Sequence, residues 1–135
     1  MRNLLSAFLL LAAPLAAHAA PDDVPLTPGQ FEAYVMGQTL TYSAASGPYG
    51  AEEYLHDHRV RWSYLDGTCQ DGRWYAAGDE ICFVYELIPD PQCWRFYLRG
   101  ERLMARFEND PGATELYETS HRSEPLICPG PRVGT

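Results

Sequence analysis

Short runs of alternating apolar and polar residues fill the stretch from Arg59 to Phe107. Alternation with a period of two indicates half-buried strands, and turn signals separate these runs about every ten residues. Asp66-Gly67 is a strong hairpin signal of this kind. The rhythm predicts a mainly β fold, namely a small antiparallel β-meander or barrel-like sheet that is dry on one face.

A short N-terminal helix is expected ahead of this sheet. Thr27 can cap the helix, Pro28 suits its first position and Gln30 completes a capping box. Gly37 is a natural end point. The apolar face, at spacings of i, i+3 and i+4, consists of Phe31, Tyr34 and Val35. We expect the helix to plug one end of a barrel or to cover an edge of the sheet.

The first 20 residues resemble a secretory signal peptide. Arg2 gives a positive start, an apolar run extends from Leu4 to Leu15, and Ala17-His18-Ala19 is a small-x-small cleavage site. The run is too short to span a membrane comfortably and no cysteine follows it for lipidation. We therefore expect an exported chain, periplasmic or extracellular, without a stable membrane anchor. Residues 21–135 would form a single β domain with its core over about 27–108 and an irregular C-terminal tail.

The chain is acidic, with a formal net charge of −8, and all of its basic Lys/Arg positions are arginine. Loss of the signal peptide, which carries one arginine and no acid, makes the mature chain one unit more negative. Such a domain is a poor candidate for binding nucleic acid or an anionic membrane, but it can attract a basic partner. An acidic surface that is merely solvated explains the same balance.

Four cysteines in an exported chain predict two disulfides. The chain has no C-x-x-C motif, which argues against a thioredoxin-like redox site, and the cysteine spacings fit no common zinc pattern. A tight Ala-Gly turn between Cys69 and Cys82 leaves them about four residues, or about 13 Å, out of register. A disulfide needs Cα atoms within about 7 Å. Cys82 can meet Cys93 if the next loop covers about residues 86–89, although a register one step later would separate them. We expect Cys82–Cys93 together with Cys69–Cys128.

The order of these motifs resembles small exported bacterial domains of unknown function. The motifs are the helix, then Gly72-Arg73-Trp74, then Ile81-Cys82, then Cys93-Trp94. Those domains have a signal peptide and a β-meander or lipocalin-like sheet with the same Gly-x-Trp…Cys…Cys-aromatic order. The resemblance covers about residues 27–108 and implies a fold, but it carries no catalytic residue across.

The segment from Glu52 to His58 is the best candidate for a metal site. On a strand, His56 and His58 would point to the same side about 7 Å apart, a spacing that can chelate one zinc or copper ion. Glu52 would supply a carboxylate from that face. Two surface histidines in a polar loop are the alternative interpretation. This alternative is favoured, because an H-x-H motif alone is a weak signal for a metal site.

Aromatic residues of the central stretch are candidates for lining a ligand cavity. The residues singled out are Trp62, Trp74, Tyr85 and Trp94. Core filling explains the same rings, because a domain of this size needs most of them for its core.

Catalysis has little support in the sequence. No G-x-S-x-G motif is present, no free cysteine is expected, and the adjacent carboxylates of Glu52-Glu53 would point to opposite faces of a strand. We expect a non-catalytic binding or interaction module without a cofactor, whose partner is a protein or a small ligand. One concrete version, based on charge and fold analogy, is an inhibitor of a basic hydrolase such as lysozyme. The alternative is a periplasmic metal-binding protein that uses His56 and His58.

Overall fold

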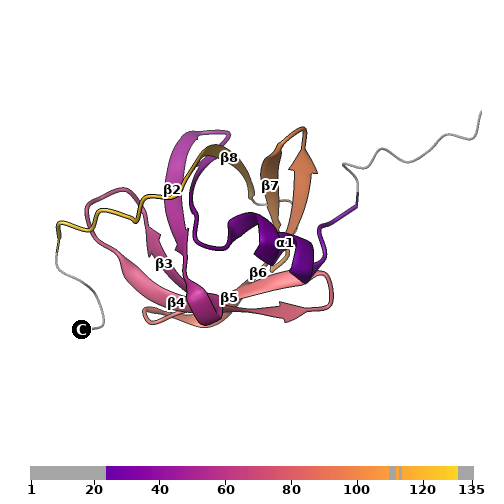
Figure 1. Cartoon of the computed structure of the whole chain (residues 1–135), viewed down its shortest axis with the longest axis horizontal. Helices are drawn as coiled ribbons and strands as arrows, with labels where there is room; N and C mark the ends of the chain where they lie inside the picture. The colour runs from indigo at the N-terminus through magenta and orange to yellow at the C-terminus, as the bar shows by residue number, and fades with distance from the viewer. Residues whose placement is uncertain (1–23, 110–111, 113, 131–135) are drawn as a thin grey trace, which may run out of the picture.

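The eight strands close into an antiparallel barrel in which each strand pairs with its neighbours in sequence and β8 pairs with β1 (Figure 1). The computed structural model describes residues 24–109, 112 and 114–130. The strands are β1 Thr39–Ala44, β2 Gly47–Tyr54, β3 Arg59–Ser63, β4 Gln70–Ala77, β5 Glu80–Tyr85, β6 Ile88–Arg99, β7 Arg102–Phe107 and β8 Glu115–Arg122. The predicted mainly β, barrel-like fold with one short N-terminal helix is confirmed. The predicted signal peptide lies outside the described residues.

Closure of the barrel depends on a strand beyond the expected core of 27–108. Strand β8 pairs with β7 through Met104 and Tyr117, and with β1 from Thr39 opposite Arg122 to Ser43 opposite Tyr117. Without β8 both β1 and β7 would present open edges. The core limit was placed too early because the alternation of β8 is weak: only Leu116 and Glu118 of this strand are buried.

Helix α1 (Pro28–Val35) plugs one end of the barrel, as predicted. The capping box forms, with the Gln30 amide donating to Thr27 Oγ1 and the Thr27 amide donating to Gln30 Oε1. Phe31 is fully buried, and its ring centroid lies 4.4 Å from that of Phe96 and 5.4 Å from that of Trp74. The helix therefore supplies an aromatic side chain to the inside of the barrel.

The predicted disulfides Cys82–Cys93 and Cys69–Cys128 are both present. The turn after β5 is tighter than the expected loop over residues 86–89, because Tyr85 already pairs with Ile88. Residues 89–91 then lie opposite Val84 alone, and this irregularity brings Cys93 directly opposite Cys82. This three-against-one bulge accommodates the two prolines, which cannot donate to a ladder.

The Cys69–Cys128 disulfide fixes the C-terminal segment to the outside of the barrel. The Leu126 amide donates to Glu53 Oε2 at 3.1 Å, and the Gly130 amide donates to the Gly67 carbonyl at 2.7 Å. Two disulfides are typical of proteins in an oxidising, exported environment. The helices in the described part of the chain are too short to cross a membrane.

A candidate ligand-binding cavity in the barrel

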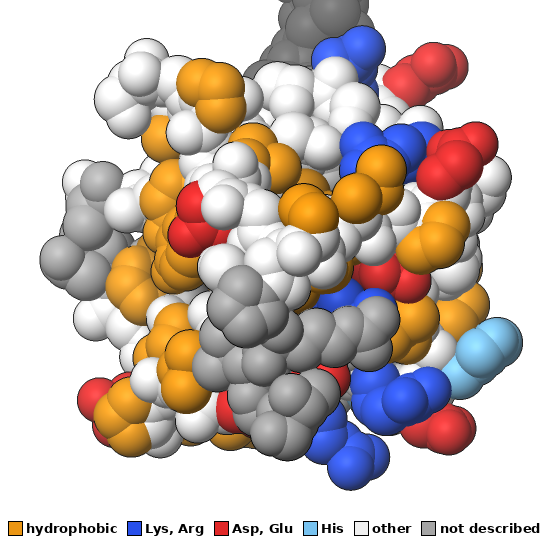
Figure 2. All heavy atoms as spheres, turned by 90° about the vertical axis from the view of Figure 1, so that its left-hand side faces the viewer, with side chains coloured by type: hydrophobic (Ala, Val, Ile, Leu, Met, Phe, Trp, Pro, Cys, Tyr) orange, Lys and Arg blue, Asp and Glu red, His pale blue; other side chains and the backbone are white. Residues whose placement is uncertain are grey.

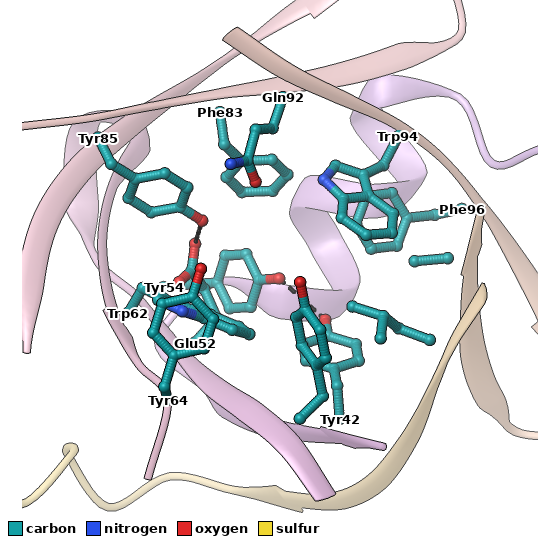
Figure 3. A pocket seen from close by; sticks show the side chains of 13 residues that line it. Tyr42, Glu52, Tyr54, Trp62, Tyr64, Phe83, Tyr85, Gln92, Trp94 and Phe96 are labelled. Carbon is teal, nitrogen blue, oxygen red and sulfur yellow. Dashed lines mark hydrogen bonds between the residues drawn. The ribbon is translucent and has the colours of Figure 1, made fainter. Parts of the chain in front are cut away.

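The inside of the barrel contains a cavity of about 40 Å³ that opens to solvent. This volume is below the roughly 300–1,000 Å³ of small-molecule sites, so a ligand larger than a few waters requires the lining side chains to move apart. Tyr54, Phe83 and Phe96 line the cavity and also contact the Phe31 ring, so they separate the cavity from the plugging helix (Figure 3). The thirteen lining residues are Tyr42, Tyr49, Glu52, Tyr54, Trp62, Tyr64, Phe83, Tyr85, Gln92, Trp94, Phe96, Ala105 and Leu116.

Three aromatic rings lie together at one side of the cavity. The Trp62 centroid is 5.4 Å from that of Tyr64, in an edge-to-face arrangement, and 5.8 Å from that of Tyr49. Trp62 is 8% exposed whereas Tyr64 is 51% exposed, so these rings extend from the interior to the surface. Gly50 makes room for the Trp62 ring, because a Cβ at this position would lie 2.2 Å from Trp62 Cζ2.

Glu52 is the acidic residue of the cavity. Strand β2 points Glu52 and Tyr54 inward and the neighbouring Glu53 outward, because successive side chains alternate between the two faces of a strand. Glu52 is 2% exposed, and its Oε1 accepts a 2.8 Å hydrogen bond from the Tyr85 hydroxyl (Figure 3). Its other oxygen, Oε2, is buried and has no hydrogen-bond partner among the described residues.

Burial dominates the ionisation of Glu52. Desolvation raises the pKa of Glu52 well above its usual value, and the hydrogen bond from Tyr85 lowers it by less. Burial likewise raises the pKa of Tyr42, Tyr54 and Tyr85, so their hydroxyls stay neutral. The Tyr42 and Tyr54 hydroxyls bond to each other at 2.9 Å. The empty cavity is thus lined by neutral groups and a carboxyl that favours its protonated form.

A second buried oxygen without a partner, Gln70 Oε1, lies close to this region but not in it. Gln70 is opposite Trp62 in the β3–β4 register, and it does not line the cavity. We therefore assign no ligand contact to Gln70.

Three of the four residues predicted to line a cavity do so, namely Trp62, Tyr85 and Trp94. Trp74 does not. Its ring lies between Phe31, at 5.4 Å, and His58, which stacks on it at 3.6 Å. The prediction was wrong for Trp74 because sequence alternation gives the face of a strand but not the height in the barrel.

The predicted metal site is not assembled. His56 and His58 lie in a short 3-10 helix, η2 (His56–His58), where Asp57 adopts left-handed φ and ψ, so the strand on which the prediction rested ends at Tyr54. His58 Nε2 lies 3.3 Å from the Glu32 carboxylate, whereas Glu52 is inside the barrel. Among the described residues, the sole cluster of potential metal ligands is Glu80 with Cys82 and Cys93, whose sulfurs form a disulfide. Metal binding by Glu52, His56 and His58 stays a prediction without a pre-formed site.

Sequence reasoning did not place Glu52 in the cavity, and it missed Tyr42, Tyr54 and Gln92. One signal was available. Gly50, Glu52 and Tyr54 are two residues apart along one strand, so their side chains lie on the same face. A glycine on this face indicates that another group approaches the backbone closely, beside the polar groups of Glu52 and Tyr54. The hydrogen-bond partner of Glu52, Tyr85, is 33 residues away, and nothing in the sequence pairs them.

Comparison with protein families, with characterised proteins and with solved structures finds no match for this chain. The resemblance to small exported domains and the lipocalin-like likeness stay predictions, whereas the β-barrel and the two disulfides are present.

Proposed function

We propose that this chain is a non-catalytic, exported binding module that holds a small ligand inside its barrel, in contact with Glu52. The observation that carries the proposal is the orphaned oxygen of Glu52: this residue lines the cavity, and its Oε2 is buried without a partner among the described residues. Buried polar atoms are almost always hydrogen-bonded, and leaving one unpaired costs about 1–3 kcal/mol. A ligand that donates to Oε2 would recover part of this free energy.

The remaining lining residues suit the apolar part of such a ligand. They are mostly aromatic, with Gln92 and the tyrosine hydroxyls as the polar groups other than Glu52. Small-molecule sites usually combine apolar walls with a few polar groups that fix orientation. Tyr64 both lines the cavity and is half exposed, so a ligand could reach solvent beside it.

Nuclear magnetic resonance of the three tryptophan indole groups tests this proposal with an internal control. We expect small aromatic probes, 2-phenylethanol and phenethylamine, to shift the indole N–H signals of Trp62 and Trp94, which line the cavity. The Trp74 signal should stay in place, because its ring packs between Phe31 and His58. The proposal is wrong if neither probe shifts Trp62 or Trp94, or if Trp74 responds equally.

A protein partner is the second version of the binding module, and the exposed apolar residues beside the mouth favour it. Tyr64 is 51% and Leu65 is 50% exposed. The net charge of −8 supports a basic partner, and an inhibitor of a basic hydrolase stays the concrete case. On the face seen in Figure 2, however, arginine and acidic side chains lie interspersed next to hydrophobic ones, so the acidic charge is not gathered there. Unchanged lysozyme activity at low salt in excess of this protein would exclude that case.

A further inference from the structure

The charge of the cavity is unbalanced. Glu52 is the sole acidic residue among the thirteen that line it, and none of the thirteen is arginine or histidine. The other titratable groups that line the cavity are tyrosines, namely Tyr42 from β1, Tyr49 and Tyr54 from β2, Tyr85 from β5 and Tyr64 beside β3. A carboxylate formed at this position would have no positive partner within the cavity, and buried charges are normally paired.

The carboxyl of Glu52 has one oxygen to which a ligand could donate. Tyr85 already donates to Glu52 Oε1, and the Tyr42 and Tyr54 hydroxyls bond to each other. Glu52 Oε2 is a buried acceptor without a partner among the described residues. In its ionised form this oxygen can bind an N–H group on a ligand in a charge-assisted hydrogen bond, which is stronger than a neutral one.

The aromatic rings favour a positive charge next to this oxygen. Trp62, Tyr64 and Tyr49 lie within 6.0 Å of one another by ring centroid, and Trp62 is opposite Glu52 in the β2–β3 register. The faces of such rings attract cations, most strongly when water is excluded. A carboxyl group next to aromatic ring faces is a combination that can bind an ammonium group.

We propose that the ligand of this cavity is a protonated amine with an apolar body, whose N–H group donates to Glu52 Oε2. This inference rests on the proposed function and specifies its ligand class. The amine nitrogen lies beside Glu52, and the apolar body lies against the rings of the cavity. Glu52 is the residue that determines specificity.

Binding of the amine releases one proton. Without a ligand, burial raises the pKa of Glu52 and favours its protonated form. When the ammonium group enters, the carboxyl group of Glu52 loses its proton to solvent, and the resulting carboxylate pairs with the ammonium. The O–H bond of the carboxyl group is the sole covalent bond that breaks. Below the pKa of Glu52 in the empty protein, the affinity should rise about tenfold per pH unit, because each binding event displaces one proton. A neutral ligand should show no such dependence.

Calorimetry with a matched pair of probes tests the ligand class. Phenethylamine and 2-phenylethanol differ in their polar head, ammonium against hydroxyl, and share the same phenylethyl body. We expect the wild-type protein at neutral pH to bind phenethylamine about ten- to a hundredfold more tightly, which corresponds to one hydrogen bond to a charged group. Titrations in buffers with different ionisation enthalpies should show release of close to one proton for the amine and none for the alcohol.

Two glutamine variants on the same strand separate the cavity from general charge effects. Glu52→Gln should remove the preference for the amine and the proton release while still binding 2-phenylethanol. Glu53→Gln is the matched control: Glu53 is the adjacent residue, but it faces outward and accepts from the Leu126 amide. This variant should keep the wild-type preference.

The outcomes distinguish this inference from the proposed function. If 2-phenylethanol binds in the cavity as tightly as phenethylamine, or if Glu52→Gln keeps the preference, the amine inference is overturned and the binding cavity remains. Tighter binding at low pH would also overturn it, because a protonated Glu52 would then be donating to an acceptor on the ligand. If neither probe binds, both the proposed function and this inference fail.

Discussion

Replacement of Glu52 by glutamine should change how the stability of the protein depends on pH. Desolvation raises the folded-state pKa of Glu52 well above its usual value of 4.5, which we take for the unfolded chain. Between these two pKa values the folded state therefore holds a proton that the unfolded state has lost. The contribution of Glu52 to stability is fully present below about pH 4.5 and is lost as the pH rises through the folded pKa.

The size of this effect follows from the number of protons. A difference of one bound proton lowers the free energy of unfolding by about 1.4 kcal/mol per pH unit within that window. For a domain of roughly 100 residues, 1 kcal/mol corresponds to about 4–8 °C in Tm. The Tm of the wild type should thus fall, relative to that of Glu52→Gln, by roughly 5–10 °C for each pH unit until the folded pKa is reached.

Thermal unfolding of both proteins from about pH 4 to about pH 8 measures this difference. Subtraction of the two curves cancels the groups that the variants share, such as His121 and the other carboxyl groups. Glu53→Gln, on the outer face of the same strand, should keep the wild-type slope. Parallel curves for the wild type and Glu52→Gln would refute the reasoning, since Glu52 would then ionise in the folded state near its usual pKa, as it would in a water-filled cavity.

The remaining predictions concern how the barrel is closed and filled. The double replacement Cys69→Ser and Cys128→Ser opens a loop of 59 residues and should lower the free energy of unfolding in denaturant titrations by about 4 kcal/mol. Phe31→Ala should lower it by about 3–5 kcal/mol, because the plugging side chain is fully buried. Gly50→Ala should shift the Trp62 indole signal and lower Tm, since the new Cβ would lie 2.2 Å from that ring; an unchanged Trp62 environment would contradict the packing.

The sequence predicts the architecture of this protein well where a local rule decides it. The capping residues Thr27 and Gln30 alone position the start of α1, and the alternation around Trp62 and Phe83 alone predicts strands. The pairing of Cys82 with Cys93 was also predicted, although the expected loop over residues 86–89 is a tighter turn followed by an irregularity at residues 89–91. Each of these inferences needs residues that are close in the chain.

The closure of the barrel and the site inside it depend on relations that local patterns do not contain. The sequence leaves Thr114 to Ser120 open between a last strand and a short helix, because Leu116 and Glu118 alone give a weak pattern, and the pairing with β1 shows that it is a strand. The segment after Tyr54 was expected to continue as a strand, but Asp57 takes a left-handed conformation and the chain turns at η2. That turn separates His56 and His58 from Glu52, which local spacing alone had brought together.

Glu52 and Glu118 are both buried in this barrel, but they differ in their hydrogen bonds. The comparison tests whether the barrel simply tolerates buried acids without partners. Glu118 is 4% exposed, and its Oε2 accepts from the Leu103 amide at 2.7 Å and from the Tyr34 hydroxyl at 2.6 Å. Its Oε1 lies 3.0 Å from His121 Nδ1. Both oxygens of Glu118 are thus paired next to the docked helix. Glu52, buried in the same barrel, keeps one oxygen without a partner among the described residues, and its side chain lines the cavity. Because the fold satisfies the buried carboxyl of Glu118, this difference supports the proposal that a bound molecule contacts Glu52.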